Sequence, residues 1–328
     1  MEFRFKSSKL TSEELVRRFN KDFETSCLSE REFTGFKKGV SGSIKEIHLN
    51  NAYVFFQDFD NDAKEHHTLQ VINYQSVFLL QFVIHGDVTF SLSDKSNKSF
   101  SLNQNMYNLY YIPASEYLSK YLNHKKQVLN IFFTEPYLVS KMGACFIVNS
   151  KKYQKSKKEN QIWSFFNGGL LINGQLRAII NEFLSCYFDG ITKQSYLESK
   201  LTELVLIALA TNDSKPETNK LRKGDRENLM KTEHYIQTHL KEELSIEKLS
   251  LLAGFNTSKF KNDFKQVYGM PVFKYITALR IEKAIVLISK HNYTIAQASY
   301  EVGYKNPQHF TVAFKKKLGY LPSKLFKK

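Results

Sequence analysis

Residues 253–265 have the sequence Ala253-Gly254-Phe255-Asn256-Thr257-Ser258-Lys259-Phe260-Lys261-Asn262-Asp263-Phe264-Lys265, and residues 302–315 repeat its outline as Val302-Gly303-Tyr304-Lys305-Asn306-Pro307-Gln308-His309-Phe310-Thr311-Val312-Ala313-Phe314-Lys315. Each stretch predicts the end of a short helix, a turn centred on glycine, and a second helix with two phenylalanines and a lysine. Gly269 follows the first stretch and Gly319 the second, where a glycine is expected to end the helix. Such a helix, tight turn and second helix with polar and basic side chains are typical of a helix-turn-helix unit.

Helical geometry divides each second helix into an inward and an outward face. We predict that the inward face packs through Phe260, Phe264 and Val267 in the first unit. Phe310 and Phe314 are the corresponding anchors in the second unit. The outward faces carry Ser258, Lys261, Asn262 and Lys265 in the first unit and Gln308, Thr311, Val312 and Lys315 in the second.

These outward side chains have the chemistry that contact with DNA requires. Asparagine and glutamine can bind adenine bidentately, lysine can reach guanine, and valine can contact a thymine methyl group. Solvated helix faces are the alternative for either unit alone, but two units with hydrogen-bonding groups on the same face favour DNA contact. We predict base or backbone contacts from Ser258, Lys261, Asn262, Gln308, Thr311 and Val312, and phosphate contacts from Lys259, Lys265, Lys305, Lys315 and Lys316. We expect the first unit to dominate specificity, and the second to supply mainly register and backbone affinity.

The segments around the two units support this arrangement. Ser245 is a predicted N-cap in the first unit, and Thr294 with Gln297 forms a predicted capping box in the second. Residues 271–290 predict a connecting helix about 30 Å long, which is close to the spacing of roughly 34 Å between successive major-groove faces on one side of DNA. One monomer could therefore present both units to adjacent groove segments. The predicted buried stripe of the first unit comprises Ile246, Leu249, Leu252 and Ala253.

The charge of the chain is concentrated in the same region. The formal net charge is +15 over 328 residues, a length that favours two domains. Residues 216–328 contain 21 Lys and Arg against 10 Asp and Glu, whereas the first 215 residues contain 26 against 22. A basic domain is attracted to polyphosphates through counterion release.

The sequence gives no sign of secretion or membrane insertion. The longest apolar runs, such as Val77–Leu80, are far shorter than the roughly 20 residues that span a bilayer. The N-terminus has no apolar core of a secretion signal, and the three cysteines are too scattered for a disulfide framework or a metal-ligand pair. We therefore expect a cytoplasmic protein with no membrane partner.

The N-terminal half has a strand-like pattern. Short segments rich in Val, Ile, Phe and Tyr alternate with turn residues, which predicts a β-barrel or sandwich. Residues 1–40 show no such pattern, although Thr11–Leu15 resembles the start of a short helix. The predicted strands are Ala52–Gln57, Leu69–Asn73, Val77–His85, Asp87–Leu92, Phe100–Asn103, Met106–Ile112 and Val128–Thr134.

Two amphipathic helices are predicted next, at residues 176–187 and 197–208, and they either cover the barrel or pair with another subunit. We predict an α+β chain with a β-rich effector-binding domain at 1–165 and a helical coupling or dimerisation segment at 166–212. A polar linker follows at 213–226, and an all-α double helix-turn-helix domain occupies 227–328. A homodimer would form through residues 174–210.

Residues from about 228 to 326 resemble the DNA-binding domain of the AraC/XylS family of bacterial transcription regulators. The resemblance implies a seven-helix domain with two helix-turn-helix units joined by a long helix. By position it assigns base or backbone contact to the six residues Ser258, Lys261, Asn262, Gln308, Thr311 and Val312. The sequence differs from the family at Val312 and near Phe326, where members often have an arginine. The matching residues are Tyr235-Ile236, Leu249 to Gly254, Phe264-Lys265, Gly269, Tyr275, Arg280, Ala284, Ile295, Gly303-Tyr304, Phe310, Phe314-Lys315-Lys316, Gly319 and Pro322.

The N-terminal part is similar in style to the cupin-like sensor domains that many family members have. The resemblance to the family as a whole implies double-stranded DNA as a partner, RNA polymerase as the partner of an activator, and a small-molecule effector. No motif names the effector or the residues that would bind it. The expected mechanism is a population shift in the placement of the DNA-binding domain or of a dimer partner.

Two other classes of function are weighed against a regulator. An enzyme of the cupin type would need a metal triad, but the His-x-His pattern with spaced Glu and His is missing, and adjacent His66 and His67 point to opposite faces of a strand. We therefore expect surface histidines there and at His85, with no metal, no cofactor and no catalytic residue. A protein whose basic helices bind another polyanion, such as RNA, is the third hypothesis.

Overall fold

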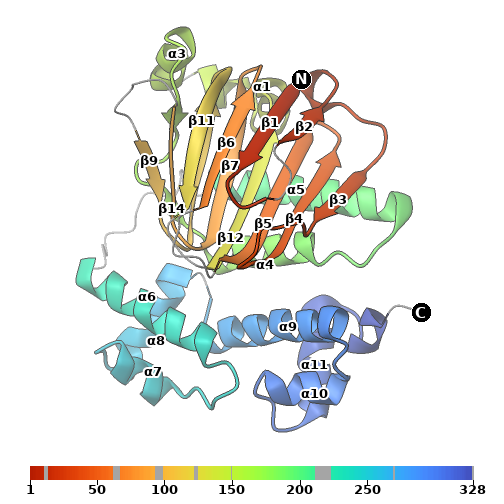
Figure 1. Ribbon diagram of the computed structural model, residues 1–328. Helices are drawn as coiled ribbons and strands as arrows, with labels where there is room; N and C mark the ends of the chain where they lie inside the picture. Colours follow the sequence, from red (N-terminus) through yellow and green to blue (C-terminus); the bar gives the residue numbers. More distant parts are fainter. Residues whose placement is uncertain are drawn as a thin grey trace. The chain divides into compact units, whose positions relative to one another are not determined.

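The computed structural model describes residues 1–10, 14–61, 67–92, 99–121, 125–148, 150–210, 223–268 and 270–326. The chain divides into two compact units, one formed by Met1–Ile172 with Asp189–Leu206, the other by Asn173–Phe188 with Ile207–Lys328. Strands dominate the first unit and helices form the second (Figure 1). Gly269 and residues 213–222 of the predicted linker lie outside the described residues, and residues 223–226 begin a helix.

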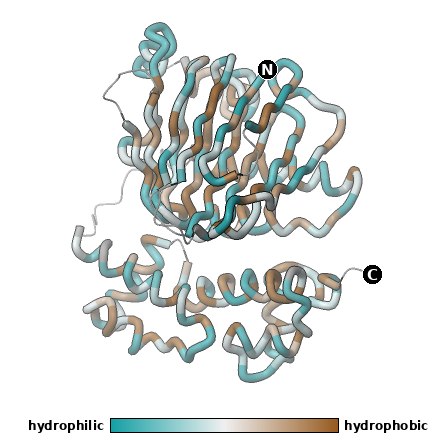
Figure 2. Tube along the Cα trace, in the orientation of Figure 1, coloured by the Kyte–Doolittle hydropathy of each residue, from teal (hydrophilic) through white to brown (hydrophobic). Residues whose placement is uncertain are grey.

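Two antiparallel sheets face each other in the first unit. One is six-stranded, with the order β2-β1-β6-β11-β8-β9, and the other is eight-stranded, with the order β13-β10-β7-β12-β5-β4-β3 and β14 beside β10. Figure 2 shows hydrophobic and hydrophilic residues alternating along these strands, as expected where one face is buried. The strands are β1 (Glu2–Ser7), β2 (Leu15–Arg18), β3 (Ser29–Phe33), β4 (Val40–Leu49), β5 (Ala52–Asn61), β6 (His67–Asn73), β7 (Val77–His85), β8 (Val88–Leu92), β9 (Ser99–Leu102), β10 (Met106–Ile112), β11 (Ser115–Tyr121), β12 (Lys125–Phe133), β13 (Trp163–Ser164) and β14 (Leu170–Leu171).

The structure confirms the β-rich character and the α+β class. All seven predicted strands coincide with observed ones, namely β5 to β10 and β12. The pairings of the described strands give two facing sheets instead of one closed sheet. Their shared core is rich in phenylalanine and tyrosine, including Phe5 stacked on Phe55 at 4.8 Å between ring centroids.

The sequence pattern misses the strands before residue 50. The helix start expected at Thr11–Leu15 is wrong for its last residue: Leu15–Arg18 form β2, which pairs antiparallel with β1, while Thr11 to Glu13 lie outside the described residues. Pairing with the edge of β1 satisfies the backbone of this short segment, and no local pattern reveals that partner.

One histidine contradicts the expectation of surface histidines. His67 on β6 is 3% exposed and is stacked against Tyr121, with ring centroids 5.0 Å apart. Lys126 on β12, also buried, donates a hydrogen bond to Nδ1 of His67, and Ser7 lies 2.8 Å from its Nε2. Burial, together with the nearby charge of Lys126, lowers the pKa of His67 to about 2. His66 lies outside the described residues and His85 is half-buried.

Helices complete the first unit. The long helix α5 (Gly190–Ala210) buries the predicted apolar residues Leu197, Leu201 and Leu204. Lys193 and Gln194 near its start bind residues beside and within β3. The remaining helical segments of this unit are η1 (Lys21–Phe23), α1 (Glu135–Met142), α2 (Ala144–Val148) and α3 (Lys151–Lys158).

The second unit is helical throughout its described part. The predicted caps are confirmed: Ser245 accepts from the amide of Lys248, and Thr294 forms a capping box with Gln297. None of the helices in the described ranges is both long enough and apolar enough to cross a membrane. The elements are α4 (Gly174–Leu184), α6 (Lys223–Thr238), α7 (Ile246–Leu252), α8 (Thr257–Tyr268), α9 (Val272–His291), α10 (Ile295–Glu301), α11 (Pro307–Leu318) and η2 (Pro322–Leu325).

Helices α4 and α5 are consecutive in sequence yet belong to different units. The predicted segment 166–212 therefore contains one helix of each unit. Within the second unit, Gly174 at the start of α4 leaves no room for a side chain, because a Cβ there would lie 2.5 Å from the carbonyl oxygen of Tyr268.

Candidate nucleic-acid interface

The first helix-turn-helix unit consists of α7 and α8. Gly254 forms the turn with φ +69, a conformation that glycine adopts at little cost. Asn256 then caps α8 by accepting a hydrogen bond from the amide of Lys259 at 2.8 Å. Phe260 and Phe264 are fully buried, which confirms the predicted inward face.

One residue of the predicted stripe in α7 is wrongly placed. Leu252 is 48% exposed, whereas Ser250 is buried. At 100° per residue, Ser250 lies about 40° beyond one edge of the stripe formed by Ile246, Leu249 and Ala253, and Leu252 lies about 60° beyond the other edge. The hydroxyl of Ser250 donates to the carbonyl of Glu247 at 3.0 Å, so this polar group is buried with a partner.

The outward face of α8 is exposed to solvent. Ser258, Lys261, Asn262 and Lys265 are all exposed. Lys259 differs from them because its ammonium binds Asp225 at 3.0 Å and Asp263 at 2.5 Å. These two carboxylates compete with a phosphate for Lys259 and leave one of the three donors of its ammonium group for a phosphate contact.

The second unit consists of α10 and α11. Gly303 turns the chain with φ +89, and Asn306 caps α11 by accepting from the amide of Gln308. Phe310 and Phe314 are fully buried in a cluster with residues of α9 and α10. The second inward face is therefore also confirmed.

The predicted contact residues of α11 are not equally available. Gln308, Lys315 and Lys316 are exposed, and Val312 is 67% exposed. Thr311 is half-buried, and its hydroxyl donates to the carbonyl of Pro307 at 2.9 Å, which leaves only its acceptor capacity. Lys305, in the turn, is exposed and binds Glu243 at 3.1 Å.

Helix α9 joins the two helix-turn-helix units and sets the distance between them. It extends over 20 residues, which corresponds to a rod of about 30 Å. Arg280 on this helix donates to the carbonyls of Leu240 and Glu242 at 3.0 and 2.9 Å. The same guanidinium lies 5.6 Å from the ring centre of Tyr304 in the turn of the second unit. One side chain thus ties the end of α6 to the second turn. Figure 1 shows α9 between α6–α8 and α10–α11.

Helix α4 packs on α9, a contact that sequence patterns do not predict. Asn181 donates a hydrogen bond to the carboxyl group of Glu282, and the buried Arg177 lies 5.5 Å from the ring centre of Tyr275. An arginine within an otherwise apolar helical face was the available signal. Helix α4 therefore packs on the helix that joins the two helix-turn-helix units.

This contact has a pH dependence that can be tested. Burial raises the pKa of Glu282 from 4.5 to about 7, although the charges of Arg177 and Lys317 and the hydrogen bond from Asn181 oppose the rise. Between these two values the folded state holds the proton more tightly than the unfolded state, so the stability of the helical unit falls as pH rises through this window.

We expect Glu282→Gln to remove most of this slope and to make the helical unit more stable than the wild type at pH 8. Urea unfolding of the full chain, followed by helical circular dichroism from pH 5 to pH 8, measures it. Glu301→Gln is the matched control, because Glu301 pairs with Lys241 on the surface and its pKa is lowered. An unchanged slope in the Glu282 variant would show that another group titrates.

Within the described part of the chain, no group of three or more His, Cys, Asp or Glu side chains could hold a metal ion. The buried His67 has a lysine and a serine as neighbours, which are not a metal-binding set.

Comparison with known proteins locates the similarity in the helical unit. A model of the family described as a helix-turn-helix domain matches residues 249–328. The HTH-type transcriptional activator Btr of Bacillus subtilis (strain 168) is 35% identical over 81 residues, which cover 25% of this chain and 15% of that protein. The probable transcriptional regulator LumQ of Photobacterium leiognathi is 27% identical over 150 residues, which cover 46% of this chain and 58% of that protein.

Among solved structures, an AraC-type transcriptional regulator from Chromobacterium violaceum is 21% identical, with a TM-score of 0.30, and the match covers 32% of this chain and 93% of that one. The chain spans less than two thirds of the length of the two curated relatives. The matched family region contains all of the predicted contact helices, α8 and α11.

Proposed function

We propose that this protein is an AraC-type transcription regulator that binds two adjacent major-groove segments of double-stranded DNA, because a helix-turn-helix family model matches residues 249–328 and its relatives include helix-turn-helix regulators. The observation that carries this proposal is the pair of exposed polar faces on α8 and α11, each fixed by two buried phenylalanines. The predicted contacts from Ser258, Lys261, Asn262, Gln308, Thr311 and Val312 are part of the proposal.

The spacing of the two faces supports binding by one monomer. Helix α9 is about as long as the distance of roughly 34 Å between successive major-groove faces. Arg280 and the α4–α9 contact hold that spacing without a second subunit. A homodimer through residues 174–210 is a separate proposal. Its second protomer would present a further pair of helix-turn-helix units to the DNA.

The β-rich unit is proposed as a cupin-like sensor for a small-molecule effector, and the protein as an activator that contacts RNA polymerase in the cytoplasm. The two facing sheets of the β-rich unit enclose an aromatic core and leave a pocket at one open edge. We propose no catalytic activity and no cofactor. The effector would shift the population of DNA-binding-competent chains.

Selection of bound duplexes from a random pool by the full chain tests this function. We expect a motif with two preferred segments about one helical turn, roughly 10 bp, apart. Inserting about 5 bp between the segments turns one of them to the opposite side of the duplex, so affinity should fall strongly.

Competition between RNA and the selected duplex completes the test. RNA of equal length should compete far less well than the selected duplex. Recovery of no preferred sequence, or equal competition by RNA, would favour the polyanion-binding alternative over a regulator.

A further inference from the structure

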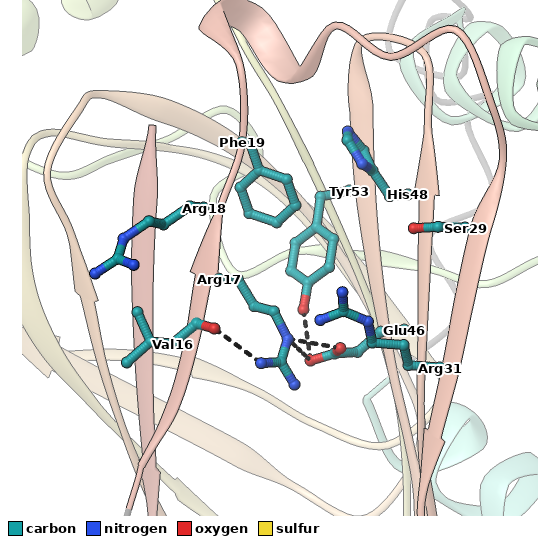
Figure 3. Close-up of a pocket in the computed structure, with 9 residues that line it drawn as sticks. All are labelled: Val16, Arg17, Arg18, Phe19, Ser29, Arg31, Glu46, His48 and Tyr53. Atoms are coloured by element: carbon teal, nitrogen blue, oxygen red, sulfur yellow. Dashed lines mark hydrogen bonds and ion pairs between the residues drawn. The ribbon is translucent and has the colours of Figure 1, made fainter.

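A pocket of about 380 Å³ opens at the edge of the first unit, where β2 of one sheet faces β3 and β4 of the other. This volume is within the range of small-molecule sites, about 300 to 1,000 Å³. Figure 3 shows the side chains of Arg17, Arg31 and Glu46 converging from these three strands. The residues that line it are Val16, Arg17, Arg18, Phe19, Ser29, Arg31, Glu46, His48 and Tyr53.

A buried carboxylate forms one wall of the pocket. Glu46 is 3% exposed and accepts from Nε of Arg17 at 2.8 Å, across the gap between the two sheets. The hydroxyl of Tyr53 donates to the same carboxylate at 2.9 Å. Burial and the charge of Glu46 raise the pKa of Tyr53 well above its ordinary value, so this hydroxyl keeps its proton and its role as a donor.

A second guanidinium faces the same carboxylate. Arg31 on β3 is directly opposite Glu46 on β4 in the antiparallel register, so both side chains lie on one face of the sheet. Figure 3 shows both guanidinium groups close to the carboxylate, with dashed interactions to it from Arg17 and from the Tyr53 hydroxyl but none from Arg31. Among the described residues, no ion pair of Arg31 is found.

The charges of this group do not cancel. Arg17 and Arg31 contribute two positive charges, and Glu46 contributes one negative charge. His48 adds none near pH 7, because burial, together with the charge of Arg31, lowers its pKa below the ordinary value of 6.5. Arg18 has its own partner in Glu2 at 2.9 Å. The pocket therefore has one positive charge in excess.

The opposite side of the pocket is aromatic. The ring of Phe19 lies 4.8 Å from that of Tyr53 and 5.0 Å from that of His48, measured between centroids. This wall suits the apolar body of a ligand, and the guanidinium groups suit its charged end, since arginine binds carboxylate and phosphate oxygens in a fixed fork.

We propose that this pocket binds a small organic anion, with its carboxylate or phosphate held by Arg31 and Arg17 and its apolar body against Phe19. The site deepens the proposed function, and its role as an effector site rests on that function. The occupant is a small molecule and not a macromolecule, because the cavity is too small to admit a folded partner.

Strand β3 offers a route by which the occupied pocket affects helix α5. Successive side chains of a strand alternate between its faces. Ser29 and Arg31 line the pocket, and Glu30 between them binds Lys193 of α5 at 2.5 Å. The amide of Leu28 donates to the side chain of Gln194 at 3.1 Å. An anion that orders Arg31 should therefore also order the start of α5.

Calorimetric titration of the full chain tests the site with defined probes. Benzoate, hexanoate and phenyl phosphate are the anions, and benzamide and hexanamide are the uncharged counterparts of the two carboxylates. At least one anion should bind, and its amide should not. The relative affinities of the carboxylates and of phenyl phosphate identify the group that the site prefers.

Arg31→Gln should weaken binding of the best anion by about tenfold or more, because one charge-assisted interaction is lost. Arg4→Gln is the matched control, since Arg4 is in the same unit, pairs with Glu2 and does not line the pocket. Failure of all three anions to bind at millimolar concentration, equal binding of the amides, or an unchanged affinity in the Arg31 variant would each overturn the proposal.

Hydrogen exchange separates this site from DNA binding. A saturating anion should slow exchange in β3 and at the start of α5, and Glu30→Gln should reduce the effect on α5 while anion binding persists. Unchanged exchange in α5 would remove the coupling route. Because neither measurement uses DNA, a failure to bind any preferred duplex would count against the proposed function alone.

Discussion

Replacing Lys261 and Asn262 together with alanine is expected to weaken binding to the selected duplex by roughly a hundredfold to a thousandfold. Each good bidentate contact with a base contributes about 1 to 3 kcal/mol of discrimination, and both side chains are exposed on the face of α8 opposite its buried phenylalanines. Binding to unrelated DNA should change far less. Affinity measurements with the selected duplex and with variants of each base position provide the test.

Two other changes separate the roles of the helices. Lys265→Ala alters an exposed lysine on the same helix. If this lysine contacts a phosphate, the variant should bind all DNA sequences more weakly by the same factor. The slope of the logarithm of the binding constant against the logarithm of the salt concentration should then fall by about one. Gln308→Ala with Thr311→Ala should cost less specificity than the pair in α8, because Thr311 is half-buried and its hydroxyl is already a donor within α11. The reverse ranking, or unaltered base preference in the Lys261 and Asn262 variant, would contradict direct recognition by α8.

The second large effect is a loss of stability in the second helix-turn-helix unit, expected from Gly303→Ala. A non-glycine residue with positive φ costs about 1 to 2 kcal/mol, and forcing an extra atom into a packed site costs about 1 to 3 kcal/mol more. At Gly303 both costs apply, since φ is +89 and a Cβ would lie 2.5 Å from the carbonyl oxygen of Leu240. That carbonyl also accepts the hydrogen bond from Arg280, so the tie between the two units would be disturbed.

Gly254→Ala is the matched control, because Gly254 occupies the same place in the first unit with φ +69, and a Cβ added there would meet nothing within 4 Å. It should cost only the backbone term. Hydrogen exchange of amides in α7 to α11 measures the free energy of opening for each unit. Equal losses in the two variants would show that the close approach at Gly303 relaxes, and that the turn alone sets the cost.

The local pattern was sufficient for most of the helical unit. Caps at Ser245, Asn256 and Thr294 and turns at Gly254 and Gly303 depend on residues close in sequence, so they could be predicted. The buried phenylalanines follow from the helical period for the same reason. Leu252 was misplaced because α7 is only two turns long, and one residue at its end lies beside the stripe.

The early strands and the pocket could not be predicted in this way. Strand β2 forms because β1 pairs with it, and β1 in turn pairs with β6, nearly 70 residues later. Arg17 and Glu46 approach each other only because two sheets face one another. No spacing within residues 1–49 contains that information, since each partner is set by a distant strand.

The sequence by itself determined the two helix-turn-helix units and the side chains that each presents outward, because helix periods, caps and glycine turns act over a few residues. Only the tertiary structure decided that Lys259 binds Asp225 in addition to Asp263 of its own helix, that α4 packs on α9, and that Arg31 faces a carboxylate already bound to Arg17. Each of these depends on charges or packing faces from distant segments, whose energies exist only once the chain has brought them together.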